Sequence, residues 1–128
     1  MDRLIAAALE ARERAWAPFS CFCVGAAIEE EDGRVFAGCN VESASYGLTM
    51  CAERVAAFRA VAEGGRRFRR IVVAADTERL TPPCGACRQV LWELCGDVEV
   101  VLVNLRGSQE SMRLSTLLPR PFDAKFLA

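Results

Sequence analysis

The sequence predicts an α/β domain in which one β-sheet is covered by helices on both faces. Segments in which apolar residues recur with helical spacing alternate with short apolar runs typical of strands, in the order αββαβαββ followed by a short tail. A sheet packed between helices is the natural arrangement for such an alternation. The chain has 128 residues and no internal repeat or linker, so we expect one domain over residues 1–128 with its own core.

The N-terminal half is predicted to contain a helix, a β-hairpin and a loop. Apolar residues follow helical spacing over residues 2–16, just before a proline. Two strand-like segments, 22–29 and 34–38, flank an Asp-Gly pair, which is a strong hairpin signal. Residues 40–50 show no clear period and predict a loop. Loops of this kind on a rigid scaffold often carry ligand contacts.

The C-terminal half alternates helices with strands. Its first helix is predicted over residues 51–63, with Val55, Phe58 and Val61 on the apolar side and a Gly-Gly pair at its end. Continuous apolar runs later in this half are expected for strands buried on both faces. The elements that follow are predicted as a strand over 71–75, a helix from 84 or 85 to 95, a strand over 98–103, an edge strand over 111–115 and a helical turn over 116–118.

Composition and charge exclude several classes of function. The formal net charge is −1, which offers no basic footprint for a nucleic-acid partner, and we interpret the arginine run at 66–70 as a solvated loop and strand edge. No apolar run is long enough to cross a membrane, and the N-terminus is unlike a signal or transit peptide, so we expect a cytoplasmic protein. Seven cysteines without a secretion signal indicate metal binding or free thiols rather than disulfides.

Three cysteines have the pattern of a zinc site. The chain contains no histidine, so such a site would use cysteine or carboxylate ligands. Cys84 and Cys87 form a C-x2-C pair, a spacing that lets two thiolates bind one tetrahedral zinc ion. Cys51 lies 33 residues earlier, also at a predicted helix N-terminus, where the positive end of the helix dipole favours a thiolate.

The number of ligands separates two kinds of zinc site. Three protein ligands leave a fourth position open, which is typical of catalytic zinc. The alternative is a closed structural site that recruits Cys39, although the chain offers no second C-x2-C pair to complete it. We interpret the cysteines outside the three-thiolate set as small hydrophobic residues. They are Cys21, Cys23, Cys39 and Cys95.

Two charged residues follow Cys51 in the first turn of its predicted helix. Glu53 can reach back over the helix N-terminus from this position, as a capping-box glutamate does, and would meet a zinc-bound water there. Arg54 is either a surface residue or a donor to the thiolates. In the second case it offsets the surplus negative charge of three thiolates on one Zn²⁺.

The chain contains five recognisable motifs: FxVGAA at 22–27, GCNVESASYG at 38–47, CAER at 51–54, PCGACRQ at 83–89 and LLPxxF at 117–122. Taken together, they resemble the small cytidine deaminases. The resemblance extends from the first helix to Phe122 and implies a three-layer α/β/α sandwich around a five-stranded mixed sheet. It also implies one zinc per subunit, held by Cys51, Cys84 and Cys87, as in the zinc deaminases with three cysteine ligands.

The resemblance further implies an activity and a set of substrate contacts. The residue matching Glu53 takes a proton from zinc-bound water, the hydroxide attacks C4 of cytosine, and the same carboxyl protonates N3 and then the leaving amine. Cytidine and 2′-deoxycytidine yield uridine and 2′-deoxyuridine, and ammonia is released. The implied contacts are Phe22 on the base, Asn40 and Glu42 on the ribose 3′-hydroxyl, Ala52 in the same pocket, Ala44 and Tyr46 on the sugar in a neighbouring subunit, and Phe122 closing an adjacent pocket of a homotetramer.

Other readings of the zinc motifs remain open from the residues alone. A deaminase of another aminopyrimidine nucleoside, such as blasticidin S, shares these motifs, although the Asn40 and Glu42 pair and the Phe122 tail favour cytidine. A nucleic-acid editing deaminase would be expected to have His-Ala-Glu and more positive charge, and neither is present. A non-enzymatic module held by structural zinc would bind its metal with no exchangeable water and show no activity.

Overall fold

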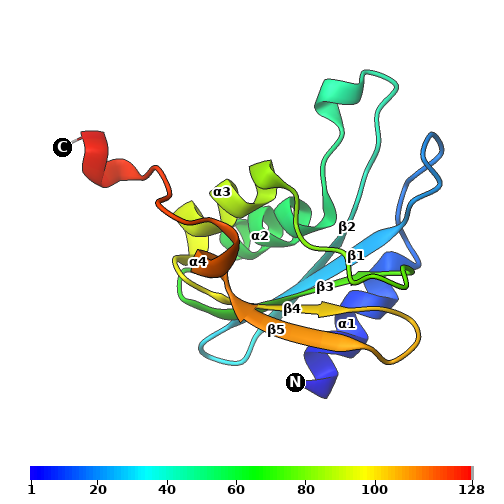
Figure 1. Ribbon diagram of the computed structural model, residues 1–128, viewed down its shortest axis with the longest axis horizontal. Coiled ribbons are helices and arrows are strands. Elements are labelled where there is room, and N and C mark those ends of the chain that lie inside the picture. Colours follow the sequence, from blue (N-terminus) through cyan, green and yellow to red (C-terminus); the bar gives the residue numbers. More distant parts are fainter. Residues whose placement is uncertain (128) are drawn as a thin grey trace.

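The computed structural model describes residues 1–127, in which five strands form one mixed sheet (Figure 1). The strand order is β2-β1-β3-β4-β5, and every neighbouring pair is antiparallel except β3 and β4, which are parallel. The predicted five-stranded mixed sheet is therefore confirmed. The strands are β1 (Val24–Glu30), β2 (Val35–Cys39), β3 (Phe68–Ala75), β4 (Glu99–Val103) and β5 (Gln109–Arg113).

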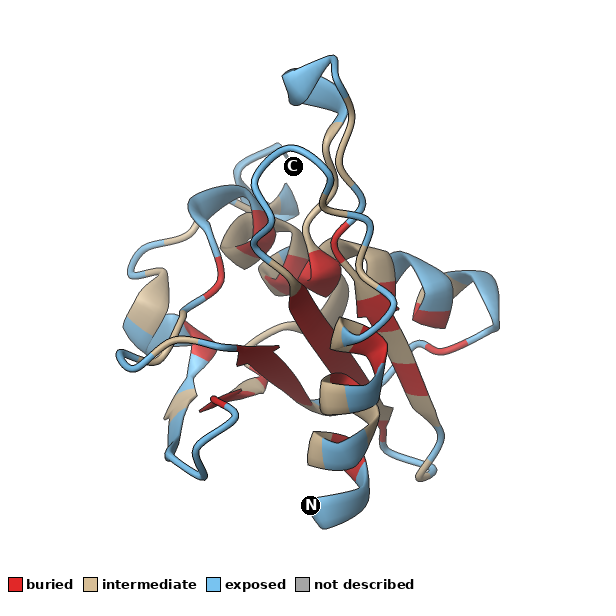
Figure 2. Cartoon of the chain, turned by 90° about the vertical axis from the view of Figure 1, so that its right-hand side faces the viewer, coloured by how far each residue is buried: buried red, intermediate tan, exposed pale blue. Residues whose placement is uncertain are grey.

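Helices cover both faces of this sheet. Helix α1 (Asp2–Arg12) packs on one face, and helices α2 (Ala52–Ala62) and α3 (Gly85–Cys95) pack on the other (Figure 1). Side chains alternate between two cores along β3, because successive residues of a strand point to opposite faces. Val72 contributes to the core beneath α1, whereas Ile71 and Val73 contribute to the core beneath α2 and α3. Both faces of the central strands are consequently buried (Figure 2).

Helix α2 packs on the sheet through alanines, which corrects the predicted apolar side of this helix. Phe58 is 45% exposed, and Val55 and Val61 are only half-buried. The cause is a close approach to β2, since a Cβ added at Gly38 would lie 2.5 Å from the backbone nitrogen of Ala56. Only small side chains fit between the helix and the sheet at this distance. The buried face consists of Ala52, Glu53, Ala56, Ala57 and Ala60.

Several element boundaries differ from the sequence-based prediction. Helix α1 ends at Arg12 instead of Trp16, because the backbone of Trp16 pairs with the loop after β2. Its N–H donates to the Asn40 carbonyl at 2.9 Å, and its carbonyl accepts from the Glu42 N–H at 2.8 Å. Strand β1 starts two residues later than predicted, β3 three residues earlier and β5 two residues earlier. The remaining elements are α4 (Leu114–Leu117) and the 3-10 helices η1 (Tyr46–Leu48) and η2 (Ala124–Leu127).

The topology brings three chain segments to one end of the sheet. Strands β2 and β3 both lead from this end into loops that enter α2 and α3. Because β1 is antiparallel to both, its first residue, Val24, lies opposite Ala75, and Gly25 lies opposite Cys39. The N-termini of two helices and the start of β1 therefore meet here. Among the residues described, no helix is long and apolar enough to span a membrane.

Candidate active site

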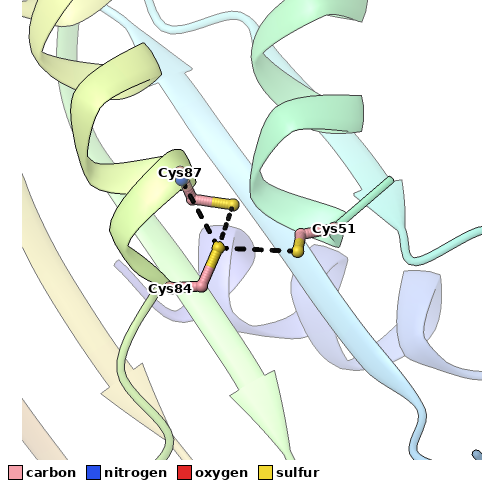
Figure 3. A group of neighbouring side chains, drawn as sticks. All are labelled: Cys51, Cys84 and Cys87. Carbon is pink, nitrogen blue, oxygen red and sulfur yellow. Dashed lines mark hydrogen bonds between the residues drawn. The ribbon is translucent and has the colours of Figure 1, made fainter. Parts of the chain in front are cut away.

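Two helix N-termini present three cysteine sulfurs to one point. Cys51 is the N-cap of α2 and Cys84 is the N-cap of α3, while Cys87 lies in the first turn of α3. The Cys87 N–H donates to the Cys84 sulfur at 3.5 Å, so the first turn of the helix holds the C-x2-C pair together. The Sγ atom of Cys84 lies 3.7 Å from that of Cys51 and 3.4 Å from that of Cys87 (Figure 3).

These sulfurs fit a tetrahedral zinc ion. All three ligand atoms lie within 4.8 Å of one another. Zinc–sulfur bonds of about 2.3 Å in a tetrahedron separate the sulfurs by about 3.8 Å, which is close to the observed spacing. Among the described residues, the cluster contains three cysteines and not Cys39, whose thiol instead donates to the Arg14 carbonyl at 3.5 Å.

Hydrogen bonds within the cluster favour the thiolate form of Cys51 over that of Cys87. The contact with the Cys87 thiol, supported by Arg54 and Cys84, lowers the pKa of Cys51 to about 5. The same contact, together with burial, raises the pKa of Cys87. The Arg54 guanidinium donates to the Cys51 sulfur through Nη2 at 3.5 Å. A further positive charge, such as a bound divalent metal, would favour the thiolate form of Cys87 as well.

Glu53 places a buried carboxyl beside this cluster. It lies in the first turn of α2 and is 4% exposed. Burial is the largest cause that raises the pKa of Glu53 to about 7, and the nearby Cys51 adds to it. A carboxyl with such a pKa exchanges protons readily near neutral pH, which is the property required of a general acid and base.

A cavity of about 300 Å³ opens above the cysteines and Glu53. This volume is at the lower end of the range of small-molecule sites. Three of the predicted substrate contacts lie outside it: Ala44 and the strongly exposed side chains of Tyr46 (77%) and Phe122 (58%). The predicted site residues that line it are Phe22, Asn40, Glu42, Cys51, Ala52, Glu53 and Cys84.

Asn40 and Glu42 line the cavity, and each holds nearby backbone through hydrogen bonds. The buried Asn40 amide accepts from the Val24 N–H at 2.8 Å and donates to the Phe22 carbonyl at 2.8 Å, which ties down the chain directly after the Phe22 side chain. Glu42 Oε1 accepts from the backbone N–H groups of Phe19 at 3.0 Å and Ser20 at 3.1 Å. Hydrogen bonds, first from the Ser20 side chain, lower the pKa of Glu42, so its carboxylate stays charged.

Comparison with known proteins agrees with this geometry. Residues 1–104 match the family described as the cytidine and deoxycytidylate deaminase zinc-binding region. The chain belongs to this deaminase family. It is 54% identical to a cytidine deaminase of Halalkalibacterium halodurans over 98% of this chain and 97% of the relative, and 47% identical to one of Sporosarcina psychrophila over 100% and 95%. A crystal structure of a cytidine deaminase from Burkholderia pseudomallei superposes with a TM-score of 0.91 at 52% identity, covering 94% of this chain and 98% of that one.

The deaminase pocket also contains residues that sequence reasoning missed. Ser20, Thr49, Thr81 and Pro82 line the cavity from three different loops. Pro82 precedes Cys84 by two residues and Ser20 precedes Phe22 by two residues, so proximity to a motif was the available signal. Thr49 Oγ1 accepts from the Ser43 N–H at 3.0 Å, which braces the loop that carries the predicted sugar contacts.

The cysteines outside the cluster have different environments. Cys21 is exposed, which corrects its interpretation as a buried hydrophobic residue, and it adopts a left-handed backbone conformation with φ of 59°. Cys23, directly before β1, and Cys39, the last residue of β2, are half-buried. Burial raises the pKa of Cys95 to about 12, so that thiol stays protonated. None of these cysteines belongs to the metal cluster found among the described residues.

Proposed function

We propose that this chain hydrolyses cytidine and 2′-deoxycytidine to uridine and 2′-deoxyuridine, with release of ammonia. The observation that carries the proposal is the position of Glu53, a buried carboxyl with a pKa of about 7 that shares one cavity with Cys51 and Cys84. The similar proteins named above are cytidine deaminases, and they match over nearly their whole length. A blasticidin S deaminase or a purely structural zinc module is therefore not favoured.

One zinc ion per subunit would be held by Cys51, Cys84 and Cys87. When bound, the metal supplies Lewis acidity that lowers the pKa of a coordinated water. Glu53 takes a first proton from the attacking water and delivers it to N3 of the base. It then takes the second proton, from the hydroxyl now bonded to C4, and delivers it to the leaving amino group. Arg54 offsets the negative charge on the Cys51 sulfur through its hydrogen bond to that atom.

The remaining pocket residues select a nucleoside. Phe22 packs against the base, Ala52 lies at the floor of the cavity, and Asn40 and Glu42 bind the ribose 3′-hydroxyl. Support for this assignment comes from the charge of Glu42, since a fixed carboxylate accepts a hydrogen bond from a hydroxyl and repels a phosphate. Nucleosides are consequently preferred over nucleotides and nucleic-acid strands.

The active assembly is a homotetramer in our proposal, with neighbouring subunits completing each pocket. Ala44, Tyr46 and Phe122 would contact the substrate in an adjacent subunit. The exposure of Tyr46 and Phe122, together with a loop and tail that extend away from the sheet, supports this arrangement (Figure 1). Pyrimidine salvage in the cytoplasm is the corresponding role, because seven free cysteines suit a reducing compartment.

The ultraviolet absorbance of cytidine, followed over time with purified protein, tests the activity. We expect loss of the cytidine spectrum with the wild type and none above background with Glu53→Gln, which retains the shape of the side chain and removes its proton exchange. No change with zinc-loaded, folded wild type would reject cytidine as the substrate. Blasticidin S would then be assayed in the same way, and inactivity on both would favour a structural zinc module.

A further inference from the structure

Ser20 lies in the segment between α1 and β1 and lines the same cavity as Cys51 and Cys84. It was not among the predicted site residues. Its side chain lines the cavity together with Phe22 and Glu42, the residues assigned above to the base and to the sugar. Ser20 therefore lies where the two halves of a nucleoside would be recognised by different segments of the chain.

The Ser20 hydroxyl connects these two segments directly. It donates a hydrogen bond to Glu42 Oε2, and it accepts one from the backbone N–H of Phe22 at 3.0 Å. The Ser20 backbone N–H adds a third contact, to Glu42 Oε1 at 3.1 Å. Both oxygens of the Glu42 carboxylate, in the loop after β2, are therefore hydrogen-bonded to the segment that carries Phe22.

The number of hydrogen bonds already accepted limits what Glu42 can still recognise. An ionised carboxylate has about four acceptor positions, two on each oxygen. Oε1 accepts from the N–H groups of Phe19 and Ser20, and Oε2 accepts from the Ser20 hydroxyl. One position remains, on Oε2. A carboxylate held in this way presents a single, oriented acceptor rather than a freely rotating pair.

We propose that Ser20 is a positioning residue that orients Glu42 toward the ribose 3′-hydroxyl and keeps it in register with Phe22. The proposal rests on the nucleoside deaminase function proposed above. Glu42 lies in a loop whose neighbours are largely exposed. Without the serine hydroxyl only Oε1 would be held, by two backbone N–H groups, and Oε2 would have to be oriented when the substrate binds. Supplying that order beforehand increases affinity for the substrate that bears the hydroxyl. Ser20 touches neither the reacting atoms nor the metal ligands, so the chemical step is left unchanged.

The decisive comparison is between Ser20→Ala and the wild type, with substrates that differ only at the 3′-position. We expect Ser20→Ala to raise KM for cytidine about tenfold, with kcat within about twofold, because one oriented hydrogen bond to a charged group is lost. KM for 3′-deoxycytidine is expected to change less than about twofold, since that substrate makes no such bond. Equal losses with both substrates, or a fall in kcat alone, would overturn the proposal.

Equilibrium binding of uridine and 3′-deoxyuridine, measured by calorimetry, gives a readout that is independent of turnover. The preference for uridine should fall about tenfold in Ser20→Ala. Ser20→Thr retains the hydroxyl and should recover the wild-type preference, whereas Ser20→Val, which has the same shape without the hydroxyl, should not. Ser111→Ala is the matched control, because it removes another serine–glutamate hydrogen bond, to Glu99 at 2.6 Å on the β4–β5 edge.

The outcomes separate this proposal from the proposed function. If the wild type neither converts cytidine nor binds uridine, both proposals fall. If the wild type is active and Ser20→Ala has the same 3′-hydroxyl preference, only the role of Ser20 is rejected. Melting temperature and zinc content are measured for each variant, and a preference lost by both Ser20→Thr and Ser20→Ala would likewise reject a role for the hydroxyl.

Discussion

Buried carboxyls lie near both ends of strand β1, and their surroundings differ. At the Val24 end, Glu53 is 4% exposed, lines the cavity and has a pKa raised by burial to about 7. At the other end, Glu30 is 6% exposed, but its oxygens accept hydrogen bonds from the backbone N–H groups of Arg66 at 2.8 Å and Arg67 at 3.2 Å. The two carboxyls are equally buried, and only one is committed to holding backbone.

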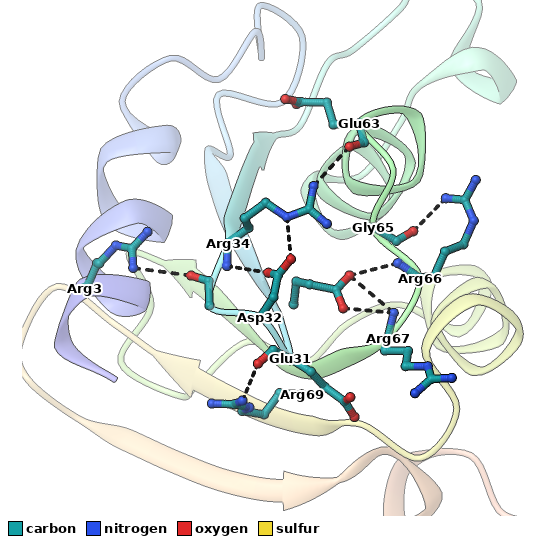
Figure 4. Close-up of polar contacts among 11 residues, drawn as sticks. Arg3, Glu31, Asp32, Arg34, Glu63, Gly65, Arg66, Arg67 and Arg69 are labelled. Atoms are coloured by element: carbon teal, nitrogen blue, oxygen red, sulfur yellow. Dashed lines mark hydrogen bonds and ion pairs between the residues drawn. The ribbon is translucent and has the colours of Figure 1, made fainter.

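The difference shows that burial alone does not distinguish a reactive carboxyl from a structural one. Around Glu30, arginine side chains hydrogen-bond to neighbouring loops. Arg34 binds Asp32 and the Glu63 carbonyl, and Arg69 binds the Glu31 carbonyl (Figure 4). The run of arginines thus fastens loops at this end of the sheet. At the cavity end, the Glu53 carboxyl instead lines an open cavity. Which polar groups remain available therefore indicates where chemistry occurs.

Removal of metal is expected to have the largest effect, and it tests whether the two ends are independent. Chelation should lower cytidine turnover to background, at least about a thousandfold, and added zinc should restore it. Far-ultraviolet circular dichroism should change little, because α1, the sheet and the Glu30 end do not depend on the cysteines. Unfolding in step with metal loss would show that the cluster also holds the distant end together.

Glu30→Ala perturbs the opposite end of β1, away from the metal cluster. It leaves the N–H groups of Arg66 and Arg67 without their acceptor, so we expect the free energy of unfolding to fall by about 2–4 kcal/mol. Turnover by the folded protein should stay within about twofold of wild type. Urea unfolding and cytidine kinetics measure the two quantities. Glu31→Ala, at the exposed neighbouring position, removes the same charge and should cost less than about 0.5 kcal/mol. A large loss of kcat in Glu30→Ala would contradict the division of roles.

Arg54→Ala should weaken the metal site and leave the fold intact. Its guanidinium donates to the Cys51 sulfur, and loss of a partner of a metal ligand typically lowers metal affinity ten- to a hundredfold. Competition with a chromophoric chelator measures the zinc affinity. Arg59→Ala is the matched control, because Arg59 lies on the same helix and pairs with Glu63 away from the cluster. Wild-type zinc affinity and turnover in Arg54→Ala would reject the role.

The smallest expected effect is a pH dependence at the β1–β2 turn. The Arg34 backbone N–H, aided by its guanidinium, lowers the pKa of Asp32 below its ordinary value of 3.8. A lowered folded pKa stabilises the fold above pH 3.8, and this stabilisation is lost as the pH falls through the folded value. Wild type should therefore melt slightly above Asp32→Asn at about pH 7, and the difference should shrink by about pH 2. A difference that grows in acid would contradict this account.

The sheet and the family resemblance were predictable because their signals are local. Alternating periods marked the elements, and the confirmed mixed sheet followed from the family motifs. The predicted end of α1 was wrong because Trp16 pairs with the loop after β2, a contact between residues far apart in sequence. The apolar side of α2 was wrong for a similar reason, since Gly38 on another element brings the helix so close that only alanines fit.

The sequence by itself determined the three cysteines, Glu53 and the order of elements, because spacing within a helical turn and hydrophobic periodicity are properties of short segments. Only the tertiary structure decided that Ser20 joins Glu42 to Phe22, that Thr81 and Pro82 share the cavity, and that Glu30 holds a distant loop. Each of these depends on hydrogen bonds or packing between segments that lie far apart in the sequence. Such contacts leave no hydrophobic period in either segment. They form only when the strand order of the sheet has brought the loops at the strand ends side by side.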